Sequence, residues 1–371
     1  MSDRSPADAD PADATPAGHA AVPSPRPTLT DVARLARVSR QTASRVARGG
    51  DQVNPRTAAR VRRAINTLGY RPDPIARALS TGRGRVLGLL THQLTNRPTS
   101  IGAMSIISGV EQAATELGYS VSIASFATFE PAAVQEGIDR LAMARCDGVI
   151  FMAPWVSGAE TIMAIDRTMP MVTTSTVPGY DGPAVHADMV RSSEEVVEHL
   201  LGLGHTTVHH VAGPADWSAS RFRALGWEQA LRRAGCAVVP PITGDWTARS
   251  GYLAGLELAN DPSVTAVFAS NDETALGLMY ALTERGLRVP EDVSVVGYDD
   301  APGSDYFRPA LTTVRVDGYE HGRTAVAHLI AQLGGESPES TVIVPHELVI
   351  RRSTAKPQRR RRSRTAASKP S

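Results

Sequence analysis

The chain has 371 residues, of which 42% are hydrophobic, so it can bury two or three compact cores, and a disordered or purely fibrous protein is excluded. The net charge of +1 conceals a segregation, because residues 28–85 carry thirteen arginines and three aspartates, whereas residues 86–355 carry 17 basic and 31 acidic residues. A basic block joined to an acidic body predicts a small polyanion-binding module attached to a domain with another task.

Residues 1–27 are rich in Ala, Pro and Asp without a periodic apolar pattern, which predicts a disordered arm. This arm does not have the basic start and apolar run of a signal peptide, and no later segment is long enough to span a membrane. We therefore expect a cytoplasmic protein. At the other end, residues 356–371 predict a disordered basic tail, which either attracts DNA without sequence preference or is merely solvated.

Three short helices are predicted between Thr28 and Gly69. Thr28, Ser39 and Asn54 stand at their starts, where a side-chain oxygen can accept from unpaired backbone N–H groups. The apolar residues recur at helical spacing: Val32, Leu35 and Ala36 in the first helix, Ala43, Val46 and Ala47 in the second, and Ala58, Val61, Ile65 and Leu68 in the third. Two helices joined by a tight turn and followed by a third predict an all-α helix-turn-helix headpiece over residues 28–71.

A hinge or linker is predicted over residues 72–84. Pro74 can start a helix there, but Ile75 to Leu79 gives barely a turn and a half before "STG" ends it. Because isolated helices this short are unstable in water, we expect this one to form only when a binding partner holds it.

From Arg85 onward, short apolar strands alternate with helix-length segments. Strands are predicted within 85–93, 119–126, 146–154, 170–176, 207–214, 266–273 and 292–300. This alternation predicts an α/β core with parallel doubly wound sheets and ligands at the carboxyl ends of the strands. The core, residues 85–355, is long for one sheet, so we expect two lobes with a cleft between them: an N-lobe of about 85–185 plus 317–345 and a C-lobe of about 186–316 plus 346–355.

The sequence contains no nucleophile elbow, P-loop or paired-acid motif, so we expect neither an enzyme nor a bound cofactor. His205, His209 and His210 lie near one strand, but the last two point to opposite faces, so no metal site is expected. Cys146 and Cys236 have no CxxC spacing, which favours two buried structural thiols.

A family resemblance is carried by several segments that occur in order between about Thr28 and Arg352. They include "TLTDVARLARVSRQTASRVARG", "YRPDPIARALSTGRGRVLGLL", "SRFRALGWEQAL", "SNDETALGLMYALTERGLRVPEDVSVVGYDD" and "LTTVRVD". Together they resemble the LacI/GalR family of bacterial transcription regulators. The resemblance implies a headpiece, a hinge helix and a two-lobed core like a periplasmic sugar-binding protein. The partners that it implies are double-stranded DNA with a palindromic operator, a small-molecule effector and a second copy of the chain. It also implies that the protein is associated with the nucleoid.

The resemblance also implies roles in DNA binding. Arg40, Gln41 and Arg45 on the second helix match base-reading positions, and Arg and Gln suit the edges of guanine and adenine. Phosphate contacts are expected from residues near helix starts and on the polar face: Thr28, Ser39, Thr42, Ser44 and Asn54. Plain helix capping is the alternative for the first three and for Asn54. In the hinge, Leu79 is implied as a minor-groove wedge and Ala76 as a neighbour of the groove floor, although Leu79 could instead be an ordinary linker residue.

Effector contacts are expected at strand ends. Arg223 can fork onto sugar oxygens, Asp299 can accept from hydroxyls, Asn271 can donate and accept, and Trp246 offers a flat apolar face; all four match sugar-contacting positions of the family. A first-lobe loop is expected to contact the effector through Gln93, Thr99 or Ser100, and Ser175 is a further candidate from that lobe. Asp272 and Arg221 are expected to support the site from behind or to pack the lobe. Packing for Trp246, and a structural ion pair for Arg223 and Asp299, remain the alternatives.

These features predict a dimeric repressor of carbohydrate-utilisation genes that a sugar, such as a galactoside or related glycoside, releases from its operator. The alternative is a regulator that uses a purine or another small metabolite as co-repressor. A purine site would need stacked aromatic residues, and the aromatic content is only 5%.

Overall fold

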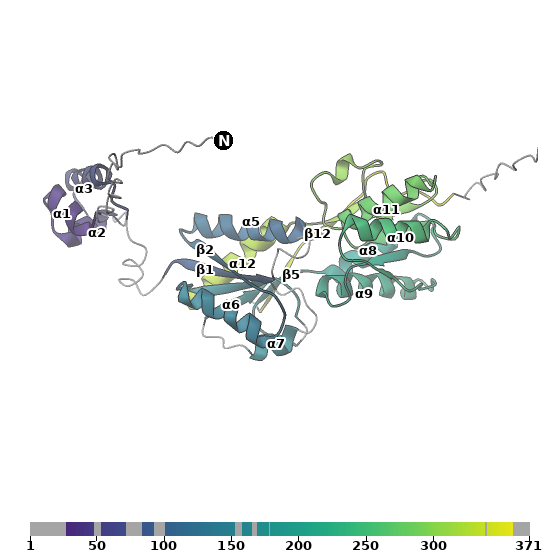
Figure 1. The fold of residues 1–371 in the computed structure, drawn as a ribbon, viewed down its shortest axis with the longest axis horizontal. Coiled ribbons are helices and arrows are strands. Elements are labelled where there is room, and N and C mark those ends of the chain that lie inside the picture. Colours follow the sequence, from purple (N-terminus) through teal and green to yellow (C-terminus); the bar gives the residue numbers. More distant parts are fainter. Residues whose placement is uncertain are drawn as a thin grey trace, which may run out of the picture. The chain divides into compact units, whose positions relative to one another are not determined.

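The computed structural model describes residues 27–47, 53–71, 84–92, 101–152, 158–164, 169–177, 179–337 and 340–358. The chain divides into two compact units, Met1–Thr81 and Gly82–Ser371, and Figure 1 shows the elements of each. Among the described helices, none is long and apolar enough to cross a bilayer.

The headpiece consists of α1 (Leu29–Ala36), α2 (Arg40–Ala47) and α3 (Pro55–Leu68). Their shared core contains Val32, Ala33 and Ala36 of α1, Ala43 and Val46 of α2, and Val61 and Ala64 of α3. Leu35, which the helical spacing grouped with Val32 and Ala36, does not share their buried face, because its side chain is 51% exposed. Positions 29, 32, 33 and 36 form the stripe that packs on the other helices, and Leu35 lies outside that stripe.

The first lobe contains a six-stranded parallel sheet of order β11-β5-β4-β3-β1-β2. Its strands are β1 (Val86–His92), β2 (Ser120–Phe126), β3 (Gly148–Met152), β4 (Met171–Thr173), β5 (Ala184–Ala187) and β11 (Thr341–Val344). Its helices are α5 (Ile101–Glu116), α6 (Pro131–Met143), α7 (Gly158–Ala164) and α12 (Gly318–Leu333).

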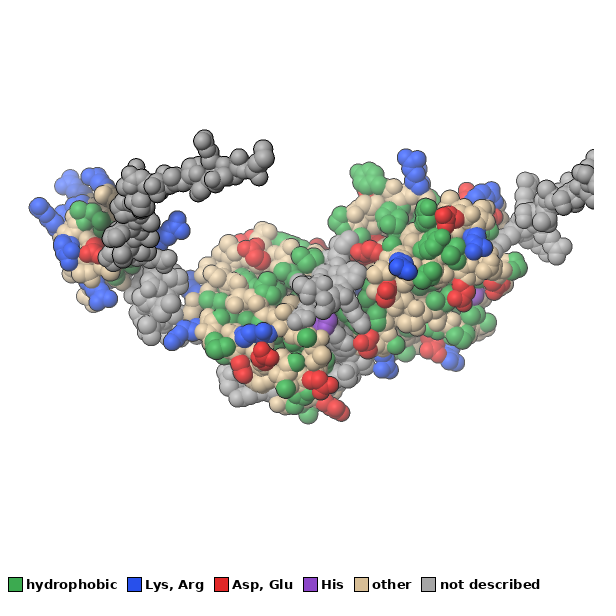
Figure 2. Space-filling model, in the orientation of Figure 1, with side chains coloured by type: hydrophobic (Ala, Val, Ile, Leu, Met, Phe, Trp, Pro, Cys, Tyr) green, Lys and Arg blue, Asp and Glu red, His purple; other side chains and the backbone are tan. Residues whose placement is uncertain are grey.

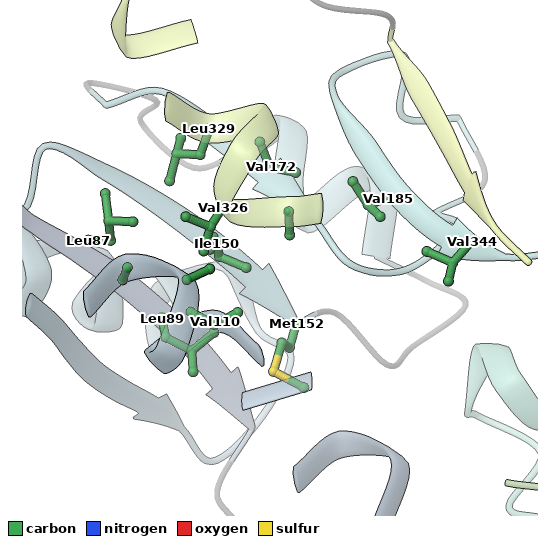
Figure 3. Packing of buried hydrophobic residues seen from close by; sticks show 13 residues of the cluster. Leu87, Leu89, Val110, Ile150, Met152, Val172, Val185, Val326, Leu329 and Val344 are labelled. Carbon is green, nitrogen blue, oxygen red and sulfur yellow. The ribbon is translucent and has the colours of Figure 1, made fainter. Parts of the chain in front are cut away.

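Both faces of this sheet are covered, as the alternation of side chains along each strand shows. Leu87, Leu89 and Ile150 pack with α5 and α12 on one face, the face drawn in Figure 3. Leu90 and Phe151 pack with α6 and α7 on the other face. Continuous apolar strands of this kind are typical of doubly wound sheets.

The second lobe repeats this arrangement with a four-stranded parallel sheet of order β7-β6-β8-β9. Its strands are β6 (His209–Ala212), β7 (Ile242–Thr243), β8 (Ala266–Ala269) and β9 (Ser294–Val296). Helices α8 (Met189–Gly202) and α9 (Ser218–Arg233) cover one face, and α10 (Ala248–Leu258) and α11 (Asp272–Glu284) cover the other. A short 3-10 helix, η1 (Ser304–Tyr306), follows β9.

One pair of strands departs from the parallel pattern. β10 (Thr313–Val316) and β12 (His346–Val349) form a two-stranded antiparallel sheet. Three segments connect the two lobes, namely those from β5 to α8, from β10 to α12 and from β11 to β12. The predicted fold class, a helical headpiece with a two-lobed core of parallel sheets, is confirmed, with this antiparallel pair as an addition.

Candidate functional site

The outer face of α2 exposes the three predicted base-reading side chains. Arg40, Gln41 and Arg45 are exposed, while Ala43 and Val46 on the opposite face are buried against α1 and α3. Arginine side chains surround the headpiece in Figure 2. The helix therefore presents donors on a surface that a polyanion can reach.

Three of the predicted phosphate contacts are helix caps. Thr28 and Asp31 form a capping box, in which Asp31 N donates to Thr28 Oγ1 over 3.3 Å and Thr28 N donates to Asp31 Oδ2 over 2.9 Å. Hydrogen bonds from Thr28 hold the pKa of Asp31 below its usual value. Ser39 Oγ accepts from Thr42 N over 3.1 Å, and Asn54 Oδ1 accepts from Arg56 N over 3.0 Å. These side chains set the helix ends, and their phosphate contacts remain predictions.

Some predicted positions lie outside the described residues. They are Ala76 and Leu79 of the hinge and Gln93, Thr99 and Ser100 of the first lobe. Thr42 and Ser44 are half-buried on α2, and Thr42 Oγ1 lies 2.9 Å from Ser39 Oγ.

A second site forms where the four parallel strands of the second lobe end. Trp217 lies in the loop after β6, Trp246 follows β7, Asn271 follows β8, and Tyr298 and Asp299 follow β9. The carboxyl ends of parallel strands meet at one edge of a sheet, and ligands of such folds bind there. The fold thus gathers side chains from four distant parts of the sequence.

Arg223, on α9, is the centre of this site. Its Nη2 donates to Asp299 Oδ1 over 3.1 Å, its Nη1 donates to the carbonyl of Ser270, and its guanidinium carbon lies 3.6 Å from the ring centroid of Tyr298. Both members of the ion pair are about nine-tenths buried. Burial raises the pKa of Asp299 to about 6, against the opposing effect of Arg223.

Two indole rings complete the walls. Trp246 is only 7% exposed, which is more buried than a loop residue facing open solvent would be. Its ring meets that of Trp217 edge to face at 5.9 Å, and Arg223 lies 5.6 Å from its centroid. Packing, the alternative for Trp246, is therefore part of its role, since its ring also fills the space beside Gly213.

Backbone strain also gathers at these loops. Trp246 has φ of +72°, Asp299 of +100° and Asp300 of +49°, in a region that side chains rarely adopt. Such residues are held by their surroundings and concentrate at ligand sites. Asp300 is fixed by two arginines, with Arg315 Nε and Arg351 Nη2 each 2.7 Å from its carboxylate.

Asn271 is 1% exposed, and its side chain links the start of α11 to the loop that carries Trp246. Its Oδ1 caps α11 by accepting from Thr274 N over 2.9 Å. Its Nδ2 donates to the carbonyl of Trp246 over 3.0 Å and to Glu273 Oε2 over 2.9 Å. Since both amide hydrogens are used, Asn271 can offer a ligand at most an oxygen lone pair, and it chiefly positions Trp246.

Asp272 supports the site from behind, as expected. It is fully buried and accepts from Ser304 Oγ and Thr313 Oγ1, each over 2.6 Å, and from Ala301 N over 2.7 Å. Burial raises its pKa to about 6, against the effect of these donors. Arg221, the other residue expected in support, is exposed.

Comparisons with known proteins match both units. The sequence model of the bacterial regulatory proteins of the lacI family matches residues 28–73, and that of the periplasmic binding protein-like domain matches residues 197–354. The lactose operon repressor of Escherichia coli is 31% identical over 334 residues, 89% of this chain and 91% of that protein. The chain belongs to the lacI family of bacterial regulatory proteins.

Solved structures agree with this assignment. A lac repressor dimer bound to operator and the anti-inducer ONPF has a TM-score of 0.81 and 31% identity, covering 88% of this chain and 99% of that one. A complex of the transcriptional regulator CelR with cellobiose has a TM-score of 0.65 and 32% identity, covering 88% of this chain and 100% of that one. This member of the lacI family is a DNA-binding transcriptional repressor, as its sequence resemblance to the LacI/GalR family indicated.

In this LacI-family repressor, four of the predicted effector residues come together, namely Arg223, Trp246, Asn271 and Asp299. Ser175 belongs to the first lobe, where it follows β4 and its carbonyl accepts from Thr173 Oγ1 over 3.2 Å; no described contact joins it to the other four. The sequence reasoning missed Trp217, Glu273 and Tyr298. The "GYDD" end of β9 was a signal for Tyr298, whereas Glu273 resembled an ordinary acid in the first turn of a helix.

Two of the three histidines near β6, His210 and His205, serve structural roles. His210 Nδ1 lies 2.9 Å from the carbonyl oxygen of Phe268, and its ring stacks on Trp227. Burial lowers its pKa to about 4. His205 contacts Thr265 and Ser294, and within the described residues no cluster of His, Cys, Asp or Glu could hold a metal ion.

Of the two free thiols, Cys146 is buried as predicted, but Cys236 is only half-buried.

Proposed function

We propose that this chain is a homodimeric repressor of carbohydrate-utilisation genes, and that a sugar inducer bound at the second-lobe site between the lobes releases it from a palindromic operator. Arg40, Gln41 and Arg45 would read bases from the exposed face of α2. Release would require the inducer to favour the lobe arrangement in which the hinge segments no longer dock on DNA. A coupling of that kind amounts to a few kcal/mol.

The observation that carries the proposal is the arrangement around Arg223. A buried guanidinium paired with Asp299 offers donors and acceptors side by side, as neighbouring hydroxyls of a sugar need. The indoles of Trp217 and Trp246 add flat apolar faces that suit the C–H side of a sugar ring. The alternative of a purely structural ion pair accounts less well for Arg223 Nε and Trp246 Nε1, which are buried without a hydrogen-bond partner among the described residues.

Two of the similar proteins fit a sugar as the ligand class. One relative is named as the lactose operon repressor, and one structural neighbour is a complex with cellobiose. By the family resemblance, Ser175 stands where lactose-type members carry an acid, and Val316 stands where many members carry a glutamine. Since a site built for hydroxyl groups rejects ligands that leave its polar groups unpaired, these departures affect which sugar binds.

A purine co-repressor is the second candidate. The observation in its favour is that two indoles, Trp217 and Trp246, stand at one site, which the low aromatic content did not lead us to expect. Their rings lie at 65° to each other, however, so they do not form the parallel pair that would sandwich a flat base. We therefore place the sugar first.

The test follows operator affinity while ligands are added. An operator is selected from a random DNA pool with the full chain, and its complex is titrated with galactosides, glucosides and purines. We expect one of the sugars to weaken DNA binding, whereas tighter binding on adding a purine would establish the alternative. Arg223→Ala should keep DNA binding and lose the response, while Arg232→Ala, an exposed arginine on the same helix, should keep both. A fully responsive Arg223→Ala protein would show that the site is wrong.

The proposed dimer has its own test. The segment after the core reads "RRSTAKPQRRRRSR", without the leucine heptad that joins dimers into tetramers in lactose-type members. Light scattering at micromolar concentration should give the mass of two chains. The mass of one chain or of four would contradict the proposal.

A further inference from the structure

The junction between the predicted hinge and the first lobe is held by one carboxylate. Gly84, the last residue of the predicted hinge, donates its N–H to Asp147 Oδ1 over 2.8 Å, and the next residue, Arg85, donates its N–H to Asp147 Oδ2 over 2.9 Å. Asp147 lies in the loop between α6 and β3. Both oxygens of one side chain therefore fix two consecutive backbone amides, with hydrogen bonds that a charged acceptor makes about twice as strong as neutral ones.

Backbone hydrogen bonds join the same segment to the neighbouring strands. The carbonyl of Arg85 accepts from Ser120 N over 3.0 Å at the start of β2, and Asp147 N donates to the carbonyl of Val86 over 2.8 Å at the start of β1. The guanidinium carbon of Arg85 lies 5.8 Å from the ring centroid of Tyr119. Because β1 lies between β3 and β2, the chain enters the sheet held by a loop on each side.

Close packing and backbone strain occur at the same place. A Cβ atom at Gly84 would overlap the carbonyl oxygen of Arg145, so the close approach requires a glycine. Arg85 has φ of +49° and Arg145 of +56°, in the left-handed region that side chains rarely adopt. Residues in this region keep their conformation because their surroundings hold it. The term hinge anchor is used below for Gly84, Arg85, Tyr119, Ser120 and Asp147.

We propose that Asp147 is a positioning residue for operator binding, because it fixes the point at which the hinge leaves the core. The two headpieces of a dimer must reach half-sites at one separation. If the hinge anchor is ordered before binding, DNA binding does not have to order it, and each backbone residue that must be ordered lowers affinity by roughly 5- to 30-fold. The inference rests on the proposed dimer, since a separation is defined only by two headpieces.

Linker length alone would change operator affinity very little. Twelve residues, 72–83, connect the described headpiece to Gly84, and freeing residues 84 and 85 adds two more. For a fully flexible tether, effective concentration falls roughly as the −3/2 power of length, which here is a change of about 1.3-fold. A larger loss of affinity therefore reports the fixed position of the hinge anchor and not the number of residues in the hinge.

The test measures binding of the full chain to three operators without effector. One is selected from a random DNA pool, and the other two have one base pair added or removed between the half-sites. We expect Asp147→Ala to bind the selected operator at least about tenfold more weakly than the wild type and to discriminate less among the three separations. Asp181→Ala removes an exposed acid of the same lobe and should behave as the wild type.

A second variant loosens the hinge anchor without changing Asp147. Gly84→Ala should show the same weaker binding and the same reduced discrimination among separations, and it carries the test if Asp147→Ala unfolds at a lower urea concentration. A role confined to stability would weaken binding to all three operators by one common factor. That result, or wild-type affinities in both variants, would overturn the proposal. Failure of the proposed dimer would appear separately, as the mass of one chain or of four in light scattering.

Discussion

Asp272 Oδ1 accepts a hydrogen bond of 2.6 Å from the hydroxyl of Thr313, which joins the start of α11 to β10. With Ser304 and Ala301 on its other oxygen, Asp272 also holds the loop directly after Asp299 and Asp300. A single buried carboxylate thereby holds the conformation of the segment that supplies the partner of Arg223.

Asp272→Asn should destabilise the core. The amide nitrogen would face a donor in place of an acceptor, and one buried polar group left unpaired costs about 1 to 3 kcal/mol. Urea unfolding should show the midpoint of Asp272→Asn well below that of the wild type. Asp305→Asn makes the same chemical change at an exposed position and should leave the midpoint unchanged. Equal midpoints for the two variants would contradict the role of Asp272.

The stability of the core should depend on the ionisation of Asp299. Because burial raises its pKa from 3.8 to about 6, the native state binds this proton more tightly than the unfolded chain does. The contribution of Asp299 is therefore fully present below about pH 4 and is lost as the pH rises through 6. The free energy of unfolding of the wild type relative to Asp299→Asn should fall by about 2 kcal/mol between pH 4 and pH 7. A difference that stays constant with pH would show that the pKa of Asp299 is not raised.

Gly213→Ala should disturb Trp246 and with it the response to the effector. A Cβ atom at Gly213 would lie 2.4 to 2.7 Å from three atoms of the Trp246 ring, so the indole must move. Where the effector complex bears the overpacking cost of about 1 to 3 kcal/mol, effector affinity should fall roughly 5- to 150-fold. Tryptophan fluorescence should shift, and operator binding without effector should persist. Gly202→Ala, where a Cβ meets nothing within 4 Å, serves as the control.

In the headpiece, we expect different residues to determine which operator sequence is preferred and how stable the helices are. Gln41→Ala removes an exposed side chain of α2 that makes no cap, so it should change the base preferred at one operator position. Asn54→Ala removes the cap of α3, which costs about 1 kcal/mol, and should weaken binding to all sequences alike. Competition between operator variants distinguishes the two effects. A changed preference in Asn54→Ala, or an unchanged one in Gln41→Ala, would contradict this division.

Much of the fold could be predicted because its signals are local. Thr28 and Asn54 mark helix starts through their own neighbours, and the apolar runs of β1, with seven residues, and of β3, with five, are long enough to recognise. The strands that prediction missed are short: β7 has two residues, and β5, β10, β11 and β12 have four each. The pairing of β5 with β11 joins Ala184 to Thr341, a contact that no local pattern reveals.

The candidate site was predicted in its chemistry and missed in part of its packing. Asp299 could be named because it follows an apolar strand, and Arg223 because it matches a sugar-contacting position of the family. The neighbours of Arg223 could not, since the contact of its guanidinium with Tyr298 depends on how α9 lies over β9. Likewise, the sequence did not reveal that Asn271 Nδ2 donates two hydrogen bonds within the protein. These bonds make Asn271 a residue that positions Trp246 more than one that contacts the effector.

The last strand of the first lobe, β11, comes from the far side of the second lobe in the sequence. No single cut between α8 and β10 yields two complete lobes, because the amino-terminal piece would lack β11 and α12. Recombination between relatives could therefore exchange the headpiece with one crossover, but would have to exchange the core whole or at several matched points. New DNA specificities are thus more easily acquired by shuffling than new effector lobes.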